Sequence, residues 1–253
     1  MMPSLPEAFL KAPIAHRALH DDNIARAENN IAAIDAAIAR GFGIEIDLQL
    51  SSDGVAMVFH DYALNRLTEG HGAFAQQSSE ALSTLRFKTG EVGVPTLKQV
   101  LDHVAGRVPL LIEVKDQDGA MGPSVGALEV AAAKALEGYG GPVALMSFNP
   151  HSVAVLAELC PHIPRGITTA NWEDEGAKLI PADRREVLGL IADYDRVGAS
   201  FISHQWSNLD APRVAELKDA GAHILCWTIR NPEDEAEARK IAENITFEGY
   251  LPT

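Results

Sequence analysis

Apolar and polar positions alternate with a period of two between Gly43 and Leu50, a stretch that reads GIEIDLQL. This period predicts a β-strand with one apolar and one polar face. The polar face carries Glu45, Asp47 and Gln49. Because acids within an apolar strand cost free energy unless they are paired or metal-bound, this strand is a candidate for function.

A hairpin is predicted directly after this strand. Asp53-Gly54 is a typical turn pair, and Val55 to Phe59 is a second β-rich run. If Asp53 and Gly54 form a two-residue turn, Asp47 lies opposite His60, on the same face as Glu45. The stretch would then gather two carboxylates and an imidazole. The alternative is an ordinary surface hairpin with one solvated face.

The rest of the chain alternates short β-like runs with helical segments, after a short leading helix within residues 1–11. The predicted strands that flank the hairpin stretch are Pro13–His16, Leu110–Lys115, Val143–Phe148, Arg165–Thr169, Phe201–Ser203, His223–Ile229 and Ile245–Leu251. The predicted helices are Ala25–Arg40 with Gly41 as its stop, Pro95–His103, Val125–Glu137, Asn149–Leu159, Pro181–Val197, Pro212–Ala220 and Asn231–Ala242. Residues 62–94 are polar and turn-rich.

This alternation predicts an α/β protein with a parallel sheet. About eight βα units in 253 residues fit a closed (β/α)₈ TIM barrel better than an open doubly wound sheet. We therefore expect residues 1–253 to form a single barrel domain with a short insertion at about 62–94. No G-x-G-x-x-G follows a strand, which argues against a dinucleotide site.

The net charge of −14 argues against a nucleic acid or an anionic membrane as the main partner. A small phosphorylated substrate remains compatible, because a local cation can reverse the local field. Cys160 and Cys226 are isolated, so buried reduced thiols are expected. Without a signal-peptide pattern or an apolar run near the ~20 residues of a membrane span, a cytoplasmic protein is the expectation. The oligomeric state is left open.

In a barrel of this type, functional residues lie at the carboxyl-terminal ends of the strands. Three acids, Glu45, Asp47 and Glu113, would converge on one mouth, and an all-oxygen ligand set favours Mg²⁺ or Ca²⁺ over zinc. Such a cation would form a positive hole for a phosphate ester together with two basic residues at strand ends, Arg17 and Lys115. Acid–base work near neutral pH is expected of two histidines, His16 and His60.

These residues resemble the motif series of the glycerophosphodiester phosphodiesterase family. The family's HRG, EN, E-x-D-x-Q, DG and FHD appear here as His16-Arg17-Ala18, Glu28-Asn29, Glu45-Ile46-Asp47-Leu48-Gln49, Asp53-Gly54 and Phe59-His60-Asp61. Its R-x-T-x-G, PTL and E-x-K, and two later strand ends, appear as Arg66-Leu67-Thr68-Glu69-Gly70, Pro95-Thr96-Leu97, Glu113-Val114-Lys115, Ser147-Phe148 and Trp227-Thr228. The series through Lys115 is more specific than any single motif.

The resemblance implies a (β/α)₈ barrel that cleaves glycerophosphodiesters to an alcohol and sn-glycerol 3-phosphate, with one divalent cation, Mg²⁺ or Ca²⁺. It assigns the cation to Glu45, Asp47 and Glu113, acid–base work to His16 and His60, and substrate contacts to Arg17, Lys115 and Trp227. In the mechanism that it implies, a glycerol hydroxyl attacks phosphorus, and water then opens the resulting cyclic phosphate.

The chain also departs from the family pattern. Ala18 replaces the glycine of HRG, and Arg230 stands where asparagine is usual after W-T-x. The chain ends in GYLPT in place of a TD-x-P pattern, which raises the alternative that segment 1–11 covers the barrel instead of a last helix. The alternative functions are a sphingomyelinase D-like or phosphoinositide phospholipase C-like enzyme with a cyclic product, and a non-catalytic phosphate-ester binding protein.

Overall fold

The computed structural model describes residues 3–252 and shows eight parallel strands that close into a barrel. The sheet order is β1-β9-β8-β7-β6-β5-β4-β2-β3, and β1 also pairs with β2, which closes the ring. The strands are β1 (Ile14–Ala15), β2 (Gly43–Leu50), β3 (Ala56–Val58), β4 (Leu110–Val114), β5 (Val143–Ser147), β6 (Arg165–Thr169), β7 (Phe201–Gln205), β8 (His223–Ile229) and β9 (Asn244–Phe247). The predicted (β/α)₈ TIM-barrel fold is confirmed.

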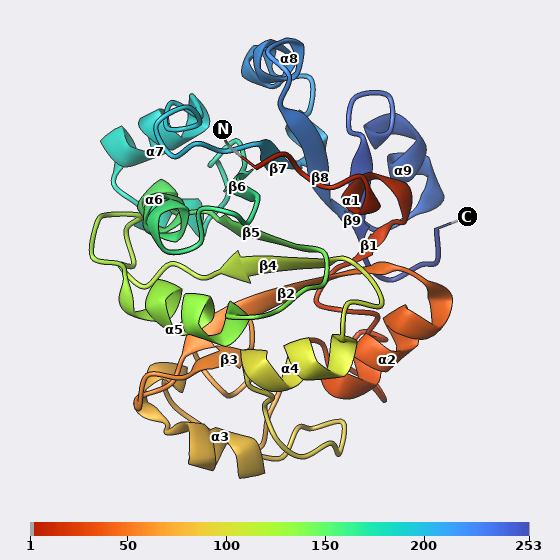
Figure 1. Cartoon of the computed structure of the whole chain (residues 1–253), viewed down its shortest axis with the longest axis vertical. Coiled ribbons are helices and arrows are strands. Elements are labelled where there is room, and N and C mark those ends of the chain that lie inside the picture. Colours follow the sequence, from red (N-terminus) through yellow and green to blue (C-terminus); the bar gives the residue numbers. More distant parts are fainter. Residues whose placement is uncertain (1–2, 253) are drawn as a thin grey trace.

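Helices follow most strands and cover the outside of the barrel, as Figure 1 shows for α4 and α5 beside β2 and β4. The α-helices are α1 (Ala8–Lys11), α2 (Ile31–Arg40), α3 (Ser79–Thr84), α4 (Leu97–Val104), α5 (Ala127–Leu136), α6 (Pro150–Leu159), α7 (Ala182–Gly189), α8 (Pro212–Asp219) and α9 (Pro232–Ala238), with 3₁₀ turns η1 (Phe74–Gln76), η2 (Ala177–Leu179) and η3 (Trp206–Asn208). Within residues 3–252, no helix combines the length and apolar character that crossing a membrane requires.

The alternation in β2 determines which side chains enter the barrel. Ile44, Ile46 and Leu48 are fully buried in the apolar layer between the sheet and the helices. Because neighbouring side chains of a strand point to opposite faces, Glu45 and Asp47 point into the barrel interior. The same rule places Glu113 of β4 inside, since Ile112 and Val114 belong to the outer layer.

The leading segment covers the amino-terminal end of the barrel. Leu5 and Phe9 are buried against inward-facing Leu111, Phe201 and Leu225. The side-chain amide of Asn244 donates to the carbonyl oxygens of Phe9 and Ala12, both at 2.7 Å. Of segment 1–11, the described residues 3–11 therefore cover the barrel as this alternative expects, while residues 1–2 lie outside the described residues, and residues 248–252 form no helix.

The hairpin forms, but its predicted register is wrong. Leu50 pairs with Ala56 and Leu48 with Val58, so Asp47 lies opposite Phe59 instead of His60. The turn has three residues, because Ser51 N–H donates to the carbonyl oxygen of Val55 and Gly54 adopts a φ of +80°. A three-residue hairpin loop commonly combines a type I turn with a residue in the left-handed region, which glycine favours.

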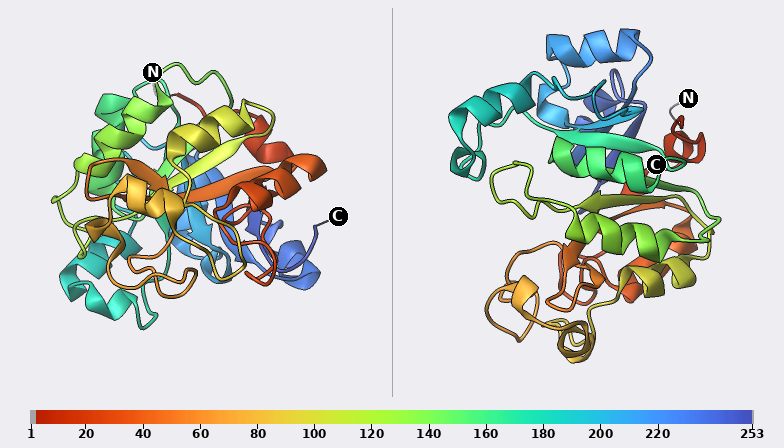
Figure 2. Two further views of the ribbon diagram at one scale, coloured as in Figure 1. Left: turned by 90° about the horizontal axis from the view of Figure 1, so that it is seen from below. Right: turned by 60° about the vertical axis from the view of Figure 1, so that its left-hand side comes forward.

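Residues 62–94 fold as an excursion beside β3, with α3 at its outer edge (Figures 1 and 2). The excursion has an apolar cluster of its own, in which the rings of Phe59 and Phe74 stack at a centroid distance of 4.8 Å. Phe87 and Val94 are also buried there. This cluster packs on the far side of β3 and fixes the chain that follows the strand, where His60 lies.

Two predicted helix starts differ because polar side chains cap the helices, and two predicted ends lie beyond the observed ones. Asn30 accepts a hydrogen bond from Ala32 N–H, so α2 begins at Ile31 instead of Ala25. Thr96 and Gln99 form a capping box, which makes Thr96 the N-cap of α4 and leaves Pro95 outside the helix. The last helix ends at Ala238 instead of Ala242, and the last strand ends at Phe247 instead of Leu251.

Candidate active site

Three carboxylates lie together at the carboxyl-terminal mouth of the barrel. Glu45 and Asp47 belong to β2, Glu113 belongs to β4, and the strand register pairs Asp47 with Glu113. All three side chains are buried, and one oxygen of each lies within 4.8 Å of the others. This group could hold a metal ion.

The contacts of Glu45 show whether a cation fits between the three carboxylates. Its Oε2 accepts the backbone N–H of Arg17 at 2.8 Å, but its Oε1 is buried and has no hydrogen-bond partner among the described residues. Burial, followed by the charges of Asp47 and Glu113, raises the pKa of Glu45 well above its usual range. A bound cation would supply the missing partner and the missing charge, so these residues fit a metal ion.

Two basic side chains border the carboxylates. Lys115 Nζ lies 2.8 Å from Asp47 Oδ1 and 2.6 Å from Glu113 Oε1, while Arg17 Nε lies 3.7 Å from Asp47 Oδ2. Burial alone would raise the pKa of Asp47, but the charges of Lys115, His60 and Arg17 outweigh it and hold that pKa well below its usual range. Burial likewise opposes the charge of Lys115, and the two carboxylates keep its pKa above the ordinary value. Asp47 and Lys115 therefore form a buried ion pair at the mouth.

The loop after β1 carries Arg17 in a backbone conformation that few side chains favour. Arg17 and Ala18 have φ values of +52° and +64°, and Ala18 N–H donates to the carbonyl oxygen of Glu45 at 2.9 Å. A left-handed residue other than glycine costs roughly 1–2 kcal/mol. The structure thus gives a physical reason why a glycine suits the position of Ala18.

His60 belongs to a continuous network of charged groups. Its Nδ1 lies 2.7 Å from Asp61 Oδ1, and Arg66 donates to both oxygens of Asp61 at 2.7 and 2.8 Å. Arg66 also donates to both oxygens of Glu28, at 2.7 and 2.9 Å, and Glu28 accepts from Arg17 at 2.9 Å. Burial would raise the pKa of Glu28, but the hydrogen bonds and charges of these arginines lower it to about 2.

His16 has a carboxylate partner of its own. Its Nδ1 lies 2.5 Å from Glu248 Oε2, a residue that follows β9 directly. Burial lowers the pKa of His16 below its ordinary value, although the hydrogen bond to Glu248 opposes the shift. Both histidines of the mouth thus bind a carboxylate through Nδ1, which leaves Nε2 as their free nitrogen.

A cavity of about 230 Å³ opens above the carboxylates. Its polar and charged lining comprises His16, Arg17, Glu45, His60, Glu113, Lys115, Thr168, Ser203, Thr228, Arg230 and Thr246. Met146 and two aromatic rings form the remaining wall: Phe148 meets Trp227 edge-to-face at 5.4 Å, and Trp227 Nε1 donates to the carbonyl oxygen of Ser203 at 2.9 Å. The cavity therefore combines a charged floor with an aromatic side.

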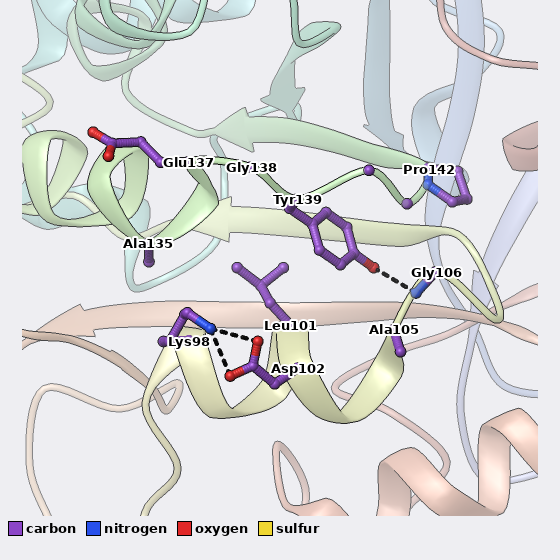
Figure 3. A pocket seen from close by; sticks show the side chains of 12 residues that line it. Lys98, Leu101, Asp102, Ala105, Gly106, Ala135, Glu137, Gly138, Tyr139 and Pro142 are labelled. Carbon is purple, nitrogen blue, oxygen red and sulfur yellow. Dashed lines mark hydrogen bonds and ion pairs between the residues drawn. The ribbon is translucent and has the colours of Figure 1, made fainter.

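A larger hollow of about 560 Å³ lies on the outside of the barrel, between α4 and the segment that follows α5 (Figure 3). Lys98 and Asp102 form an exposed ion pair there, and Gly106 N–H donates to the hydroxyl of Tyr139 at 3.2 Å. Its charged groups, Lys98, Asp102 and Glu137, are exposed to solvent, so the mouth of the barrel, where charged groups are buried, is the better candidate for chemistry.

The structure brings all eight sequence-predicted site residues to one end of the barrel. His16, Arg17, Glu45, His60, Glu113, Lys115 and Trp227 line the cavity, and Asp47 lies among them against Lys115. His60 reaches the mouth although the predicted hairpin register is wrong, because it lies past the end of β3.

Sequence reasoning assigned no role to three residues that hold these side chains in place. Asn29 binds Asp47, Arg66 joins Asp61 to Glu28, and Glu248 binds His16. The motifs EN and R-x-T-x-G contained the signal for Asn29 and Arg66. Glu248 had no such signal, because it belongs to none of the motifs that the chain shares with the family.

The fold and this mouth define a TIM-barrel protein suited to a cation and a phosphate ester, and comparison with known proteins agrees. The model of the glycerophosphoryl diester phosphodiesterase family matches residues 16–244. A glycerophosphodiester phosphodiesterase of Caldanaerobacter subterraneus subsp. tengcongensis is 31% identical over 234 residues, which cover 87% of this chain and 86% of the relative. The chain belongs to this family of phosphodiesterases, which are hydrolases.

Solved structures share the fold. An Oleispira antarctica phosphodiesterase, solved in complex with the product sn-glycerol-3-phosphate, superimposes with a TM-score of 0.77 at 23% identity and covers 95% of this chain and 94% of its own. A glycerophosphodiester phosphodiesterase of Agrobacterium tumefaciens gives a TM-score of 0.67 at 25% identity, with coverages of 93% and 96%.

Proposed function

We propose that this protein hydrolyses glycerophosphodiesters to an alcohol and sn-glycerol 3-phosphate with the help of one divalent cation, Mg²⁺ or Ca²⁺. The observation that carries the proposal is the buried group of Glu45, Asp47 and Glu113 beneath a cavity that both histidines line. Family membership and the product bound by the Oleispira antarctica relative support the same substrate class.

The three carboxylates are the proposed ligands of the cation. The orphaned Oε1 of Glu45 supports this assignment, and so does the all-oxygen donor set, which suits Mg²⁺ and Ca²⁺. When bound, the cation would polarise a phosphoryl oxygen and orient the glycerol moiety.

The charged side chains of the mouth have distinct proposed roles. Arg17 and Lys115 neutralise the charge that develops on the phosphate oxygens, since hydrogen bonds from cations to such oxygens are strong in a buried site. Trp227 packs against the departing alcohol, and its aromatic face discriminates only weakly between different alcohols.

His16 and His60 move the protons. A glycerol hydroxyl oxygen attacks phosphorus and gives its proton to one histidine, while the bond from phosphorus to the alcohol breaks and the alcohol oxygen takes a proton from the other. Water then opens the cyclic phosphate with the two roles reversed, which yields sn-glycerol 3-phosphate. The Nδ1 bonds to Glu248 and Asp61 support this assignment, because they leave both Nε2 atoms for proton transfer.

The proposed partner is a small diester, and the net charge of −14 supports the absence of a nucleic-acid or membrane partner. A cytoplasmic location stays a prediction, consistent with the two free cysteines Cys160 and Cys226.

A head-group panel tests the function. Glycerophosphocholine, glycerophosphoethanolamine and bis(p-nitrophenyl) phosphate are incubated with the protein, and released sn-glycerol 3-phosphate or nitrophenol is measured with chelator and after Mg²⁺ or Ca²⁺ is restored. We expect both glycerol diesters to be cleaved only with the cation. A protein that binds these diesters but releases no product with either cation would be a binding protein instead.

A further inference from the structure

Glu248 contacts three different basic side chains at the mouth of the barrel. Its Oε2 lies 2.5 Å from His16 Nδ1 and 3.8 Å from His20 Nε2, and its Oε1 lies 2.6 Å from Arg230 Nη2. The side chain of Glu248 is only 17% exposed, and that of His16 14%. Burial of Glu248 opposes its charge, but the hydrogen bond from His16 and the nearby side chains of His20 and Arg230 hold its pKa well below the usual range.

The backbone of two neighbouring strands holds His16 and Glu248 next to each other. Strands β1 and β9 are neighbours in the sheet (Figure 1), with Ile14 opposite Thr246 and Ala15 opposite Phe247. His16 N–H continues the ladder by donating to the carbonyl oxygen of Phe247 at 2.9 Å. Because His16 and Glu248 each follow the last paired residue of their strands, the register itself brings the imidazole and the carboxylate together.

A carboxylate at Nδ1 has a defined chemical effect. It stabilises the tautomer with the proton on Nδ1, so that Nε2 is free to accept a proton from the reacting groups. Arg230 holds the second oxygen, which restricts rotation of the carboxylate. His60 and Asp61 form the matching arrangement on the other side of the mouth.

We propose that Glu248 is a positioning residue for His16: it holds the imidazole by Nδ1, while Arg230 anchors the carboxylate, so that Nε2 faces the scissile phosphate. This inference rests on the proposed function, in which His16 transfers a proton. It gives Arg230, which replaces the family's usual asparagine, the task of fixing the orientation of Glu248.

The test compares Glu248→Gln with Glu248→Asp. Glutamine can present its N–H groups to Nδ1 and so favour the wrong tautomer, whereas aspartate keeps the charge. We expect Glu248→Gln to lower kcat on glycerophosphocholine by at least about 10-fold and by at most about 10⁴-fold, the loss known for removal of a carboxylate that orients a catalytic histidine. The KM should change less than about twofold. Glu248→Asp should recover part of the loss.

The chain offers a matched control. His223 Nδ1 lies 2.6 Å from Glu243 Oε2, where His223 is the first residue of β8 and Glu243 directly precedes β9, so this contact lies at the amino-terminal end of the barrel. Glu243→Gln removes an equivalent histidine–carboxylate contact far from the mouth, and it should leave kcat unchanged.

Proton NMR provides a readout that does not depend on turnover. A short N–H···O⁻ bond shifts its proton far downfield, and the resonance of His16 is identified by its loss in His16→Ala. We expect this resonance to vanish or to move upfield in Glu248→Gln and to persist in Glu243→Gln.

The outcomes separate the two proposals. An inactive wild-type protein would contradict the proposed function, and the downfield resonance would still test the contact between Glu248 and His16. If the wild-type protein is active and Glu248→Gln keeps its kcat or the downfield resonance, Glu248 does not position His16. Equal losses in Glu248→Gln and Glu248→Asp, with a raised KM, would also overturn the inference.

Discussion

Asn29 and Asp47 bind each other through two reciprocal hydrogen bonds. Asn29 Nδ2 donates to Asp47 Oδ2 at 2.8 Å, and the backbone N–H of Asp47 donates to Asn29 Oδ1 at 3.1 Å. Both residues are buried, and Asn29 has a φ of +57°, a conformation that asparagine tolerates better than most residues. The loop before α2 thereby orients a proposed metal ligand of β2.

Replacement of Asn29 by Asp should disrupt this orientation. The new carboxylate would face Asp47 at hydrogen-bond distance and would lose the donor, so repulsion should turn the ligand away. We expect Mg²⁺ affinity, measured by calorimetry, to fall about 10- to 100-fold, the usual effect of losing a group that orients a ligand. Asn65→Asp, at an exposed position of the excursion, is the control. Unaltered affinity in Asn29→Asp would show that Asp47 needs no such support.

Replacement of Glu113 by Gln should weaken metal binding and activity together. The substitution preserves shape but removes one of three carboxylate charges, and it leaves Lys115 with Asp47 as its one remaining charged partner among the three carboxylates. Calorimetry with Mg²⁺ and Ca²⁺, and the rate of glycerophosphocholine cleavage, should both fall, while exposed Glu137→Gln should match the wild-type protein. Unchanged metal binding would remove Glu113 from the ligand set.

The two histidines should each be needed for turnover. We expect His16→Ala and His60→Ala to lose about 10²- to 10⁴-fold in kcat while they remain folded by circular dichroism. The double variant should lose much less than the product of the single losses, because both side chains serve one proton path. Near-normal turnover in either single variant would refute the pairing.

Glu28 should make stability depend on pH in acid. Its pKa is lowered from 4.5 to about 2 in the folded protein, which corresponds to about 3 kcal/mol. Because the folded pKa is depressed, this stabilisation is present above pH 4.5 and is lost as the pH falls toward 2.

Urea unfolding from pH 7 downward measures this effect. The difference in unfolding free energy between the wild-type protein and Glu28→Gln should be largest above pH 4.5 and should shrink as the pH approaches 2. Exposed Glu158→Gln should follow the wild-type curve throughout. A difference that stays constant with pH would mean that the arginine network does not depend on the charge of Glu28.

Local patterns predicted much of the fold. The runs Arg165–Thr169 and His223–Ile229 were predicted with the bounds that β6 and β8 have, because turn-forming residues lie close to both ends of each run. The end of β9 was harder to predict, because Glu248-Gly249-Tyr250-Leu251 still reads as a partly apolar continuation. The hairpin register was wrong because Asp53-Gly54 is compatible with both two- and three-residue loops.

The candidate site followed from one rule, that parallel strands present their carboxyl ends at one mouth. That rule gathers Glu45, Asp47 and Glu113 without any knowledge of distances. It cannot find Glu248, which lies 232 positions from its partner His16 and meets it only when β9 closes the ring against β1. The period of apolar and polar residues within a strand does not indicate which residues meet when the first and last strands of the barrel pair.

We propose that a glycerol hydroxyl attacks phosphorus in a cation-dependent hydrolysis. Phosphorus NMR during turnover of glycerophosphocholine tests it most directly, with bis(p-nitrophenyl) phosphate, which has no glycerol hydroxyl, run in parallel. Intramolecular attack gains heavily from proximity, so the hydroxyl-free diester should be a poor substrate. We predict that sn-glycerol 3-phosphate is the end product and that it forms only when Mg²⁺ or Ca²⁺ is present. Accumulation of cyclic phosphate without hydrolysis, or equal rates on the hydroxyl-free diester, would contradict this account.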